Sequence, residues 1–206
     1  MSTSSRRAPP PKPGDGDHHG NLRNALVEAA MGLIEQGDGT DFSLREAARQ
    51  VGVTVNATYR HFASKEDLMT AVAAEGFRRF SLALLKGTEQ QDSAEARLMG
   101  SGRAYVRFAC DHPALFRLMF SRFSAGQTHP ELASNARLAY HTLKAGMAQT
   151  LKKDVEDPAV AVAAVRAWSL AHGLSFLILD GQLAAQPLSE EELVNAILGE
   201  PPVTPP

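Results

Sequence analysis

Residues 42–68 read FSLREAARQVGVTVNATYRHFASKEDL and predict a short helix that ends in a tight turn. Ser43 and Glu46 have the spacing of a capping box, in which each side chain bonds the backbone N–H of the other residue. A helix is therefore expected over about 44–51. Gly52 follows it, at a position where the chain can take a positive φ because glycine has no Cβ to clash.

A second short helix is predicted over about 55–61, with Thr54 as its N-cap. Its residues are mostly polar or small: Val55, Asn56, Thr58, Arg60 and His61. A helix that enters the major groove of DNA must be slim and carry such groups near its N-terminal end. Two short helices joined at a glycine have the shape of a helix-turn-helix, but also of a corner in an unrelated helical bundle. The spacing alone leaves both interpretations open.

Helical periodicity continues on both sides of this stretch, and no segment alternates as a β-strand does. Caps, prolines and glycines mark the ends of the further helices. These helices are expected over about 21–36, 65–86, 94–111, 130–151, 158–180 and 190–198, with a short one after Pro113. Together with the two short helices, they predict an all-α fold of about nine helices.

The composition limits the possible classes of function. The chain has 206 residues and a net charge of −2, so any contact with DNA must come from a local patch. Cys110 is the only cysteine, and no histidine has a partner at metal-binding spacing, so no disulfide, metal site or cofactor is expected. The longest uncharged apolar stretch, 168–179, is too short for a membrane span, and no signal sequence is recognised. We therefore expect a cytoplasmic protein with no membrane partner.

The 42–68 stretch, together with the helix before it, resembles the N-terminal domain of TetR-family transcriptional regulators. The Gly52-Val53-Thr54 turn, Tyr59-x-His61-Phe62 and Ser64-Lys65-Glu66-x-Leu68 occur in the family's order and spacing. Thr58 departs from the pattern, since much of the family carries an aliphatic residue or a proline there.

Two segments of the second half resemble the Trp–His–Gly type of TetR C-terminal domain. They are Arg117-Leu118-Met119-Phe120 and Trp168-Ser169-Leu170-Ala171-His172-Gly173. The resemblance implies a homodimeric repressor that leaves a palindromic operator when a small molecule binds the C-terminal domain.

The domain boundaries follow from the resemblance and from the composition of the two ends. Residues 1–19 and the tail 199–206 are poor in large apolar side chains and are expected to be disordered. A DNA-binding domain is expected over 20–66. A ligand-binding and dimerisation domain is expected over 67–206.

Within the first domain, the candidate DNA contacts are polar, basic or small. They are Ser43, Thr54, Val55, Asn56, Thr58, Tyr59, Arg60, His61 and Lys65. Asn56 is the best candidate to read a base, because an amide can pair with adenine through two hydrogen bonds. Thr54, Tyr59 and Lys65 are candidates for phosphate contacts, which position the protein without reading sequence. The alternatives are a helix cap for Thr54, a core residue for Tyr59 and a solvated side chain for Asn56.

Bulky apolar and aromatic residues recur at helical spacing in the second half, where they predict a packed core or a ligand cavity. The candidate ligand contacts are Tyr105, Phe108, Phe116, Met119, Phe120, Tyr140, Trp168 and His172. Trp168 and His172 lie one turn apart, so their polar tips can converge on a ligand or find partners within the core. We expect a mainly hydrophobic ligand of small net charge, because no lysine or arginine obviously belongs to this interior.

The helix expected over 158–180 is apolar nearly all round, which predicts burial on more than one side. One side is expected to face the core or cavity and another a partner subunit. The candidate residues of the dimer interface are Leu174, Ile178, Leu193 and Ile197.

Two other functions stay open at this point. One is a helical enzyme that acts on a lipophilic substrate in the C-terminal cavity. Only His172 stands as a possible base for it, and no acid or nucleophile accompanies that residue, so we expect no enzyme. The other is a helix-turn-helix regulator without a small-molecule inducer, which a cavity-free core would favour.

Overall fold

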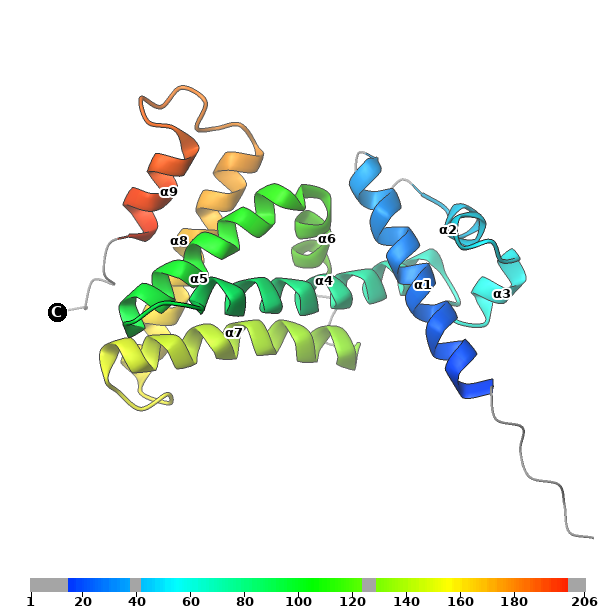
Figure 1. The fold of residues 1–206 in the computed structure, drawn as a ribbon, viewed down its shortest axis with the longest axis horizontal. Coiled ribbons are helices and arrows are strands. Elements are labelled where there is room, and N and C mark those ends of the chain that lie inside the picture. The colour runs from blue at the N-terminus through cyan, green and yellow to red at the C-terminus, as the bar shows by residue number, and fades with distance from the viewer. Residues whose placement is uncertain (1–14, 38–41, 124–128, 200–206) are drawn as a thin grey trace, which may run out of the picture.

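The computed structural model describes residues 15–37, 42–123 and 129–199, and all regular secondary structure in these ranges is helical (Figure 1). The nine helices of the described ranges are α1 Asp15–Gln36, α2 Leu44–Val51, α3 Val55–Tyr59, α4 Lys65–Thr88, α5 Ala94–Asp111, α6 Pro113–Phe123, α7 Pro130–Leu151, α8 Pro158–Leu179 and α9 Glu190–Leu198. The all-α prediction is therefore confirmed.

The helix boundaries differ from the predicted ones mainly in the first domain. Helix α1 begins at Asp15, so part of the arm expected to be disordered is helical. Its first turns lack apolar periodicity, which is why the pattern began only at Asn21. Helix α3 ends at Tyr59, because the chain tightens there into a turn in which His61 N–H donates to the carbonyl of Thr58 at 3.0 Å. Residues 1–14 and 200–206 lie outside the described residues.

Helix α4 is the axis of the molecule and joins its two ends (Figure 1). Helices α1, α2 and α3 gather around its N-terminal end, while α5, α6 and α7 pack along the rest of it. Helices α8 and α9 lie at the end of the molecule opposite α2 and α3. One continuous core runs through the two ends, from Leu26 and Leu68 to Phe80 and Phe116.

Helices α4 and α5 approach each other closely where two glycines meet. A Cβ built on Gly100 would lie 2.1 Å from the carbonyl oxygen of Gly87, and one on Gly87 would lie 2.6 Å from the carbonyl oxygen of Gly100. No side chain fits at either position without moving the helices apart. The absence of a Cβ at these two residues therefore sets the spacing between α4 and α5.

Helix α8 is unusually apolar for a helix so little buried in its own chain. By length and composition α8 is apolar enough to cross a membrane, which the shorter stretch 168–179 did not suggest. Only 28% of its most apolar 18-residue segment is buried. One such helix is weak evidence for a membrane span. What the observation establishes is that one protomer leaves much of the α8 surface uncovered.

Candidate nucleic-acid interface and apolar cavity

The turn between α2 and α3 is built from the local interactions that the sequence predicts. Ser43 Oγ accepts from the N–H of Glu46 at 3.2 Å, and Glu46 Oε2 accepts from the N–H of Ser43 at 2.7 Å. The hydroxyl of Ser43 also donates to Glu46, and together these bonds hold the pKa of the Glu46 carboxyl below its usual range. Gly52 has φ 76°, and the N–H of Val53 closes the end of α2 on the carbonyl of Ala48 at 3.0 Å.

The capping hydroxyls of Ser43 and Thr54 differ in whether their hydrogen is already used in a hydrogen bond. Ser43 uses its hydroxyl both to accept from and to donate to Glu46. Thr54 Oγ1 accepts from the N–H of Ala57 at 3.2 Å, an interaction that leaves its hydroxyl hydrogen available to a phosphate. Of the two residues, Thr54 therefore stays the better candidate for a phosphate contact.

Helix α3 presents its polar residues to solvent. Asn56 and Arg60 are exposed, Tyr59 is 54% exposed, and Val55 and His61 are half-buried. Lys65, the first residue of α4, places its Nζ 5.1 Å from the centroid of the Phe42 ring. The N-terminal end of a helix carries a partial positive charge, and the lysine adds to it. Together they favour an anionic partner such as phosphate.

Thr58, predicted from the sequence to contact DNA, is instead a core residue. Its side chain is 0% exposed, and its Oγ1 has no hydrogen-bond partner among the described residues. The periodicity of so short a helix does not reveal which side chain turns inward. The structure also accounts for the aliphatic residue that the family pattern carries here, because an apolar side chain suits a buried position better.

Replacing Thr58 with valine should raise the free energy of unfolding by up to about 1 kcal/mol, because it removes a buried hydroxyl that lacks a partner while keeping the side chain's shape. DNA affinity should not change. Chemical denaturation and DNA-binding titrations on the same preparation check both expectations. A folded valine variant with clearly weaker DNA binding would contradict this and indicate that Thr58 contacts DNA.

Helices α4 to α9 form a partly open cavity of about 970 Å³ with a largely apolar wall. Residues from α4 to α9 line it, among them four of the predicted ligand contacts: Tyr105, Phe120, Tyr140 and Trp168. Phe108, Phe116 and Met119 are instead core residues that support the wall, with exposed fractions of 6%, 0% and 0%. Arg137, Arg166 and Glu95 also line the cavity, contrary to the expectation that no basic residue belongs there.

Tyr105 and Trp168 line the cavity and form a hydrogen-bonded group with His172, a predicted ligand contact that is not itself among the lining residues. Tyr105 Oη lies 2.8 Å from His172 Nδ1, and Trp168 Nε1–H donates to Tyr105 Oη at 3.3 Å. Burial lowers the pKa of His172 and raises that of Tyr105, so both side chains are neutral near pH 7. The polar tips of Tyr105 and Trp168 thus find hydrogen-bond partners within this group and do not need one from a ligand.

Two of the four residues predicted at a dimer interface lie inside the protomer. Leu174 and Ile178 are 4% and 9% exposed and form a cluster with Val106, against which Ile197 packs. Helix α9 folds back on α5 and α8 of its own chain and covers this face. Leu193 is half-buried. The exposed apolar side chains of α8 are different ones: Val162, Val165, Leu170 and Leu177.

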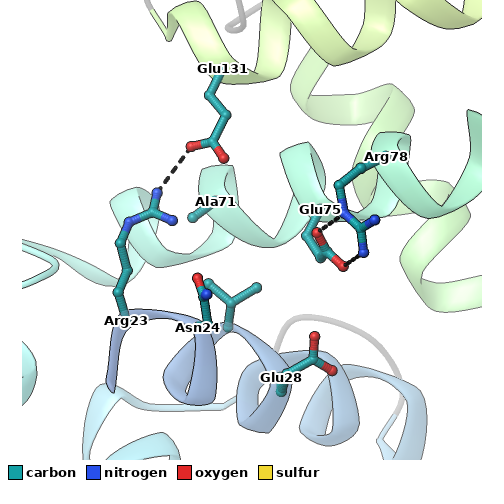
Figure 2. Close-up of a pocket in the computed structure, with 8 residues that line it drawn as sticks. Arg23, Asn24, Glu28, Ala71, Glu75, Arg78 and Glu131 are labelled. Carbon is teal, nitrogen blue, oxygen red and sulfur yellow. Dashed lines mark hydrogen bonds and ion pairs between the residues drawn. The ribbon is translucent and has the colours of Figure 1, made fainter. Parts of the chain in front are cut away.

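A polar cleft of about 290 Å³ separates α1 from α4 and α7 (Figure 2). Arg23 of α1 pairs with Glu131 of α7 at 3.1 Å (Figure 2). Glu28 of α1 pairs with Arg79 of α4. Glu75 accepts from Arg78 at 2.6 Å and from Arg79 at 2.8 Å, and the Arg78 guanidinium is the main cause of its lowered pKa. The pairs of Arg23 with Glu131 and of Glu28 with Arg79 connect α1 to α7 and α4, and sequence periodicity gave no sign of them.

Comparison with known proteins gives two family matches. Residues 26–72 match the model of bacterial regulatory proteins of the tetR family, and residues 98–200 match the model of the tetracyclin repressor-like C-terminal domain. An uncharacterized HTH-type transcriptional regulator of Haemophilus influenzae is 27% identical over 120 residues, 58% of each chain. The nucleoid occlusion factor SlmA of a Marinomonas species is 27% identical over 110 residues, 52% of this chain and 54% of that protein. The chain thus matches just over half the length of these curated relatives.

Solved structures share the fold over most of the chain. A protein of unknown function from Rhodococcus sp. RHA1 has a TM-score of 0.75 and 29% identity, covering 88% of this chain and 94% of that one. The TetR-family regulator PfmR of Thermus thermophilus has a TM-score of 0.60 and 19% identity, covering 84% and 94%. At that level of identity the second likeness concerns the fold alone.

Proposed function

The chain belongs to the TetR family of bacterial regulatory proteins, and from this premise we propose that it is a homodimeric transcriptional regulator, a repressor that leaves a palindromic operator when a small hydrophobic molecule binds. The observation that carries the proposal is the α2–α3 unit. Its second helix exposes Asn56 and Tyr59, the exposed Arg60 follows as the C-cap, and Thr58 anchors the helix in the core. A cytoplasmic location accords with this function.

Contact with DNA depends on a small positive patch rather than on the charge of the whole domain. Residues 1–86 contain 11 Lys/Arg and 10 Asp/Glu. Arg23, Arg78 and Arg79 are already paired with carboxylates in the cleft between the domains. Other basic residues can meet phosphates near the α2–α3 turn: Arg45, Arg49, Arg60 and Lys65. Such a small set predicts a moderate dependence of affinity on salt.

The cavity supports a hydrophobic effector, since a mainly apolar wall with few polar groups is the usual composition of a small-molecule site. Arg137 and Arg166 in the lining add a place where one anionic group of the effector can lie. The cavity also weighs against a regulator without an inducer. Regulators of this family are not enzymes, and the Nδ1 of His172, the one possible base, is already bonded to Tyr105.

The release mechanism that we propose is mechanical. Phe77, Phe80 and Leu84 of α4 line the cavity, and the same helix begins beside α3. A ligand that prefers another tilt of α4 would change the separation of the two α3 helices, which must be about 34–36 Å to meet successive major grooves. The ion pairs of Arg23 with Glu131 and of Glu28 with Arg79 would carry the movement to α1.

Three substitutions at the interface should separate base reading from phosphate contact. Asn56→Ala should relax the sequence preference at one position per half-site, because its amide reads a base edge. Tyr59→Phe and Lys65→Ala should weaken binding to all duplexes alike, because phosphates carry no sequence information. Titrations with a specific and a random duplex check this. Equal losses on both duplexes for Asn56→Ala would contradict the base-reading role.

A further inference from the structure

We propose that Arg137 and Tyr140 of α7 bind the carboxylate of the effector, and that the effector is a carboxylic acid with a long apolar body. The inference rests on the proposed effector site and names the chemical class that this site takes. Three features of the cavity wall carry it: two neighbouring polar side chains without partners, a change along α7 from cationic to apolar, and an excess of positive charge.

Arg137 is a cation without an ion pair in a largely apolar wall. It lines the cavity, is exposed to solvent, and has no carboxylate partner among the described residues. Its own helix supplies none, since the residues one turn away are Ala133, Ser134, Tyr140 and His141. A guanidinium presents two parallel N–H donors that fit the two oxygens of a carboxylate. Arg137 is therefore able to bind such a group from a ligand.

Tyr140 adds a second donor on the same side of α7. It follows Arg137 by three residues, and side chains at this spacing are neighbours on a helix. Tyr140 is half-buried and lines the cavity, with its ring centroid 6.0 Å from that of Trp168. Its hydroxyl has no hydrogen-bond partner among the described residues. One carboxylate can accept from the guanidinium and from this hydroxyl together.

The cavity wall changes its character along α7. Arg137 is followed on the same face of the helix by Tyr140, Leu143 and Met147, all of which line the cavity. Arg137 is exposed where the cavity opens to solvent, whereas Met147 is 0% exposed. The helix rises by about 15 Å between these two residues. A ligand with one charged end and a long apolar body fits this order, because its charge stays hydrated while its body is buried.

The remaining polar groups of the wall favour an anion or are already bonded. Tyr105 and Trp168 find their partners within their own hydrogen-bonded group. Glu95 is the only carboxylate among the described lining residues, and hydrogen bonds from its own N–H and from a serine side chain lower its pKa. Arg166 adds a further positive charge to that of Arg137. Two guanidinium groups against one bonded carboxylate favour an anionic ligand over a cationic one.

Two matched pairs of ligands test the preference for an anion. The dyes 1-anilinonaphthalene-8-sulfonate and N-phenyl-1-naphthylamine share an aromatic body and differ in the sulfonate. Decanoate and decanol share an alkyl chain and differ in the carboxylate, and both are titrated as competitors of the neutral dye. Energy transfer from Trp168, the only tryptophan of the chain, reports whether a dye lies in the cavity.

The variants to compare with the wild type are Arg137→Gln, Tyr140→Phe and the double variant, each of which keeps the size of the side chain. Arg107→Gln is the matched control. Arg107 is also exposed and has no ion-pair partner among the described residues, but it lies on α5 outside the cavity lining. Circular dichroism confirms that each variant is folded.

The wild type and the control should bind decanoate more tightly than decanol. Arg137→Gln should weaken decanoate binding about tenfold and Tyr140→Phe about threefold, because each removes a hydrogen bond to a charged group. Decanol and the neutral dye should change by less than about twofold. The double variant should lose less than the product of the two single losses, because both side chains hold one carboxylate.

Unchanged decanoate affinity in folded Arg137→Gln would overturn the inference, as would equal losses for decanoate and decanol. Either result would leave the proposed hydrophobic effector site intact, because the neutral dye and decanol would still bind. A wild type that binds neither dye nor either alkyl chain would overturn the inference and the proposed effector site together. None of these measurements involves DNA, so they do not depend on the proposed operator.

Discussion

Replacing Phe116 with alanine should lower the free energy of unfolding by about 3–5 kcal/mol. Phe116 is 0% exposed, and its ring centroid lies 4.8 Å from that of Phe120 and 5.7 Å from those of Tyr105 and Phe176. These rings come from three different helices, so the space left by the missing ring cannot collapse without moving whole helices. Chemical denaturation followed by circular dichroism measures the change.

The matched control for this prediction is Leu138→Ala. Leu138 is 56% exposed on α7, so its truncation should change the free energy of unfolding by less than about 0.5 kcal/mol. Leucine and alanine also have similar helix propensities. A loss below about 1 kcal/mol for Phe116→Ala would contradict the packing of the aromatic core, since even modest cavities in cores have larger effects.

Replacing Trp168 with alanine should abolish or strongly blunt the response to the effector while leaving operator affinity nearly intact. Trp168 lines the cavity, its Nε1–H donates to Tyr105, and its ring centroid lies 6.0 Å from that of Tyr140. Ligand binding in the cavity is coupled to DNA binding only through the conformational equilibrium of the protein. Removing the ligand's contact therefore removes its influence without touching the DNA-binding residues.

The test begins with a thermal-shift screen of small hydrophobic compounds, with and without a carboxylate, against the wild type. Compounds that stabilise the protein and release it from DNA are then titrated against Trp168→Ala, His172→Ala and the surface control Leu138→Ala. Trp168→Ala should bind DNA as the wild type does and fail to release it. If both Trp168→Ala and His172→Ala respond like the wild type at the same compound concentration, the effector site lies elsewhere.

The sequence predicted best what local interactions determine. The capping box of Ser43 and Glu46, the positive φ of Gly52 and the Thr54 cap are all present in the structure, because each depends only on residues a few positions apart. The helix-turn-helix and most helix boundaries follow from such signals. The beginning of α1 at Asp15 was missed because its first turns have no apolar pattern to read.

Features that depend on packing between distant segments could not be predicted. Leu174 and Ile178 looked like interface residues because the sequence does not reveal that α9 folds back over them. Thr58 looked like a DNA contact for a similar reason, since only the packed structure turns it inward. Arg137 and Arg166 reach the cavity from α7 and α8, and helical periodicity alone placed neither of them there.

Selection of bound sequences from random duplex DNA tests whether paired α3 helices read a palindromic DNA site. We expect enrichment of an inverted repeat whose half-site centres lie about 34–36 Å apart, or one helical turn more, since each subunit presents one recognition helix to the major groove. Asn56→Ala should then lose preference at one symmetric pair of positions. Enrichment of no sequence by the folded wild-type protein, or of a single site without two-fold symmetry, would contradict the claim.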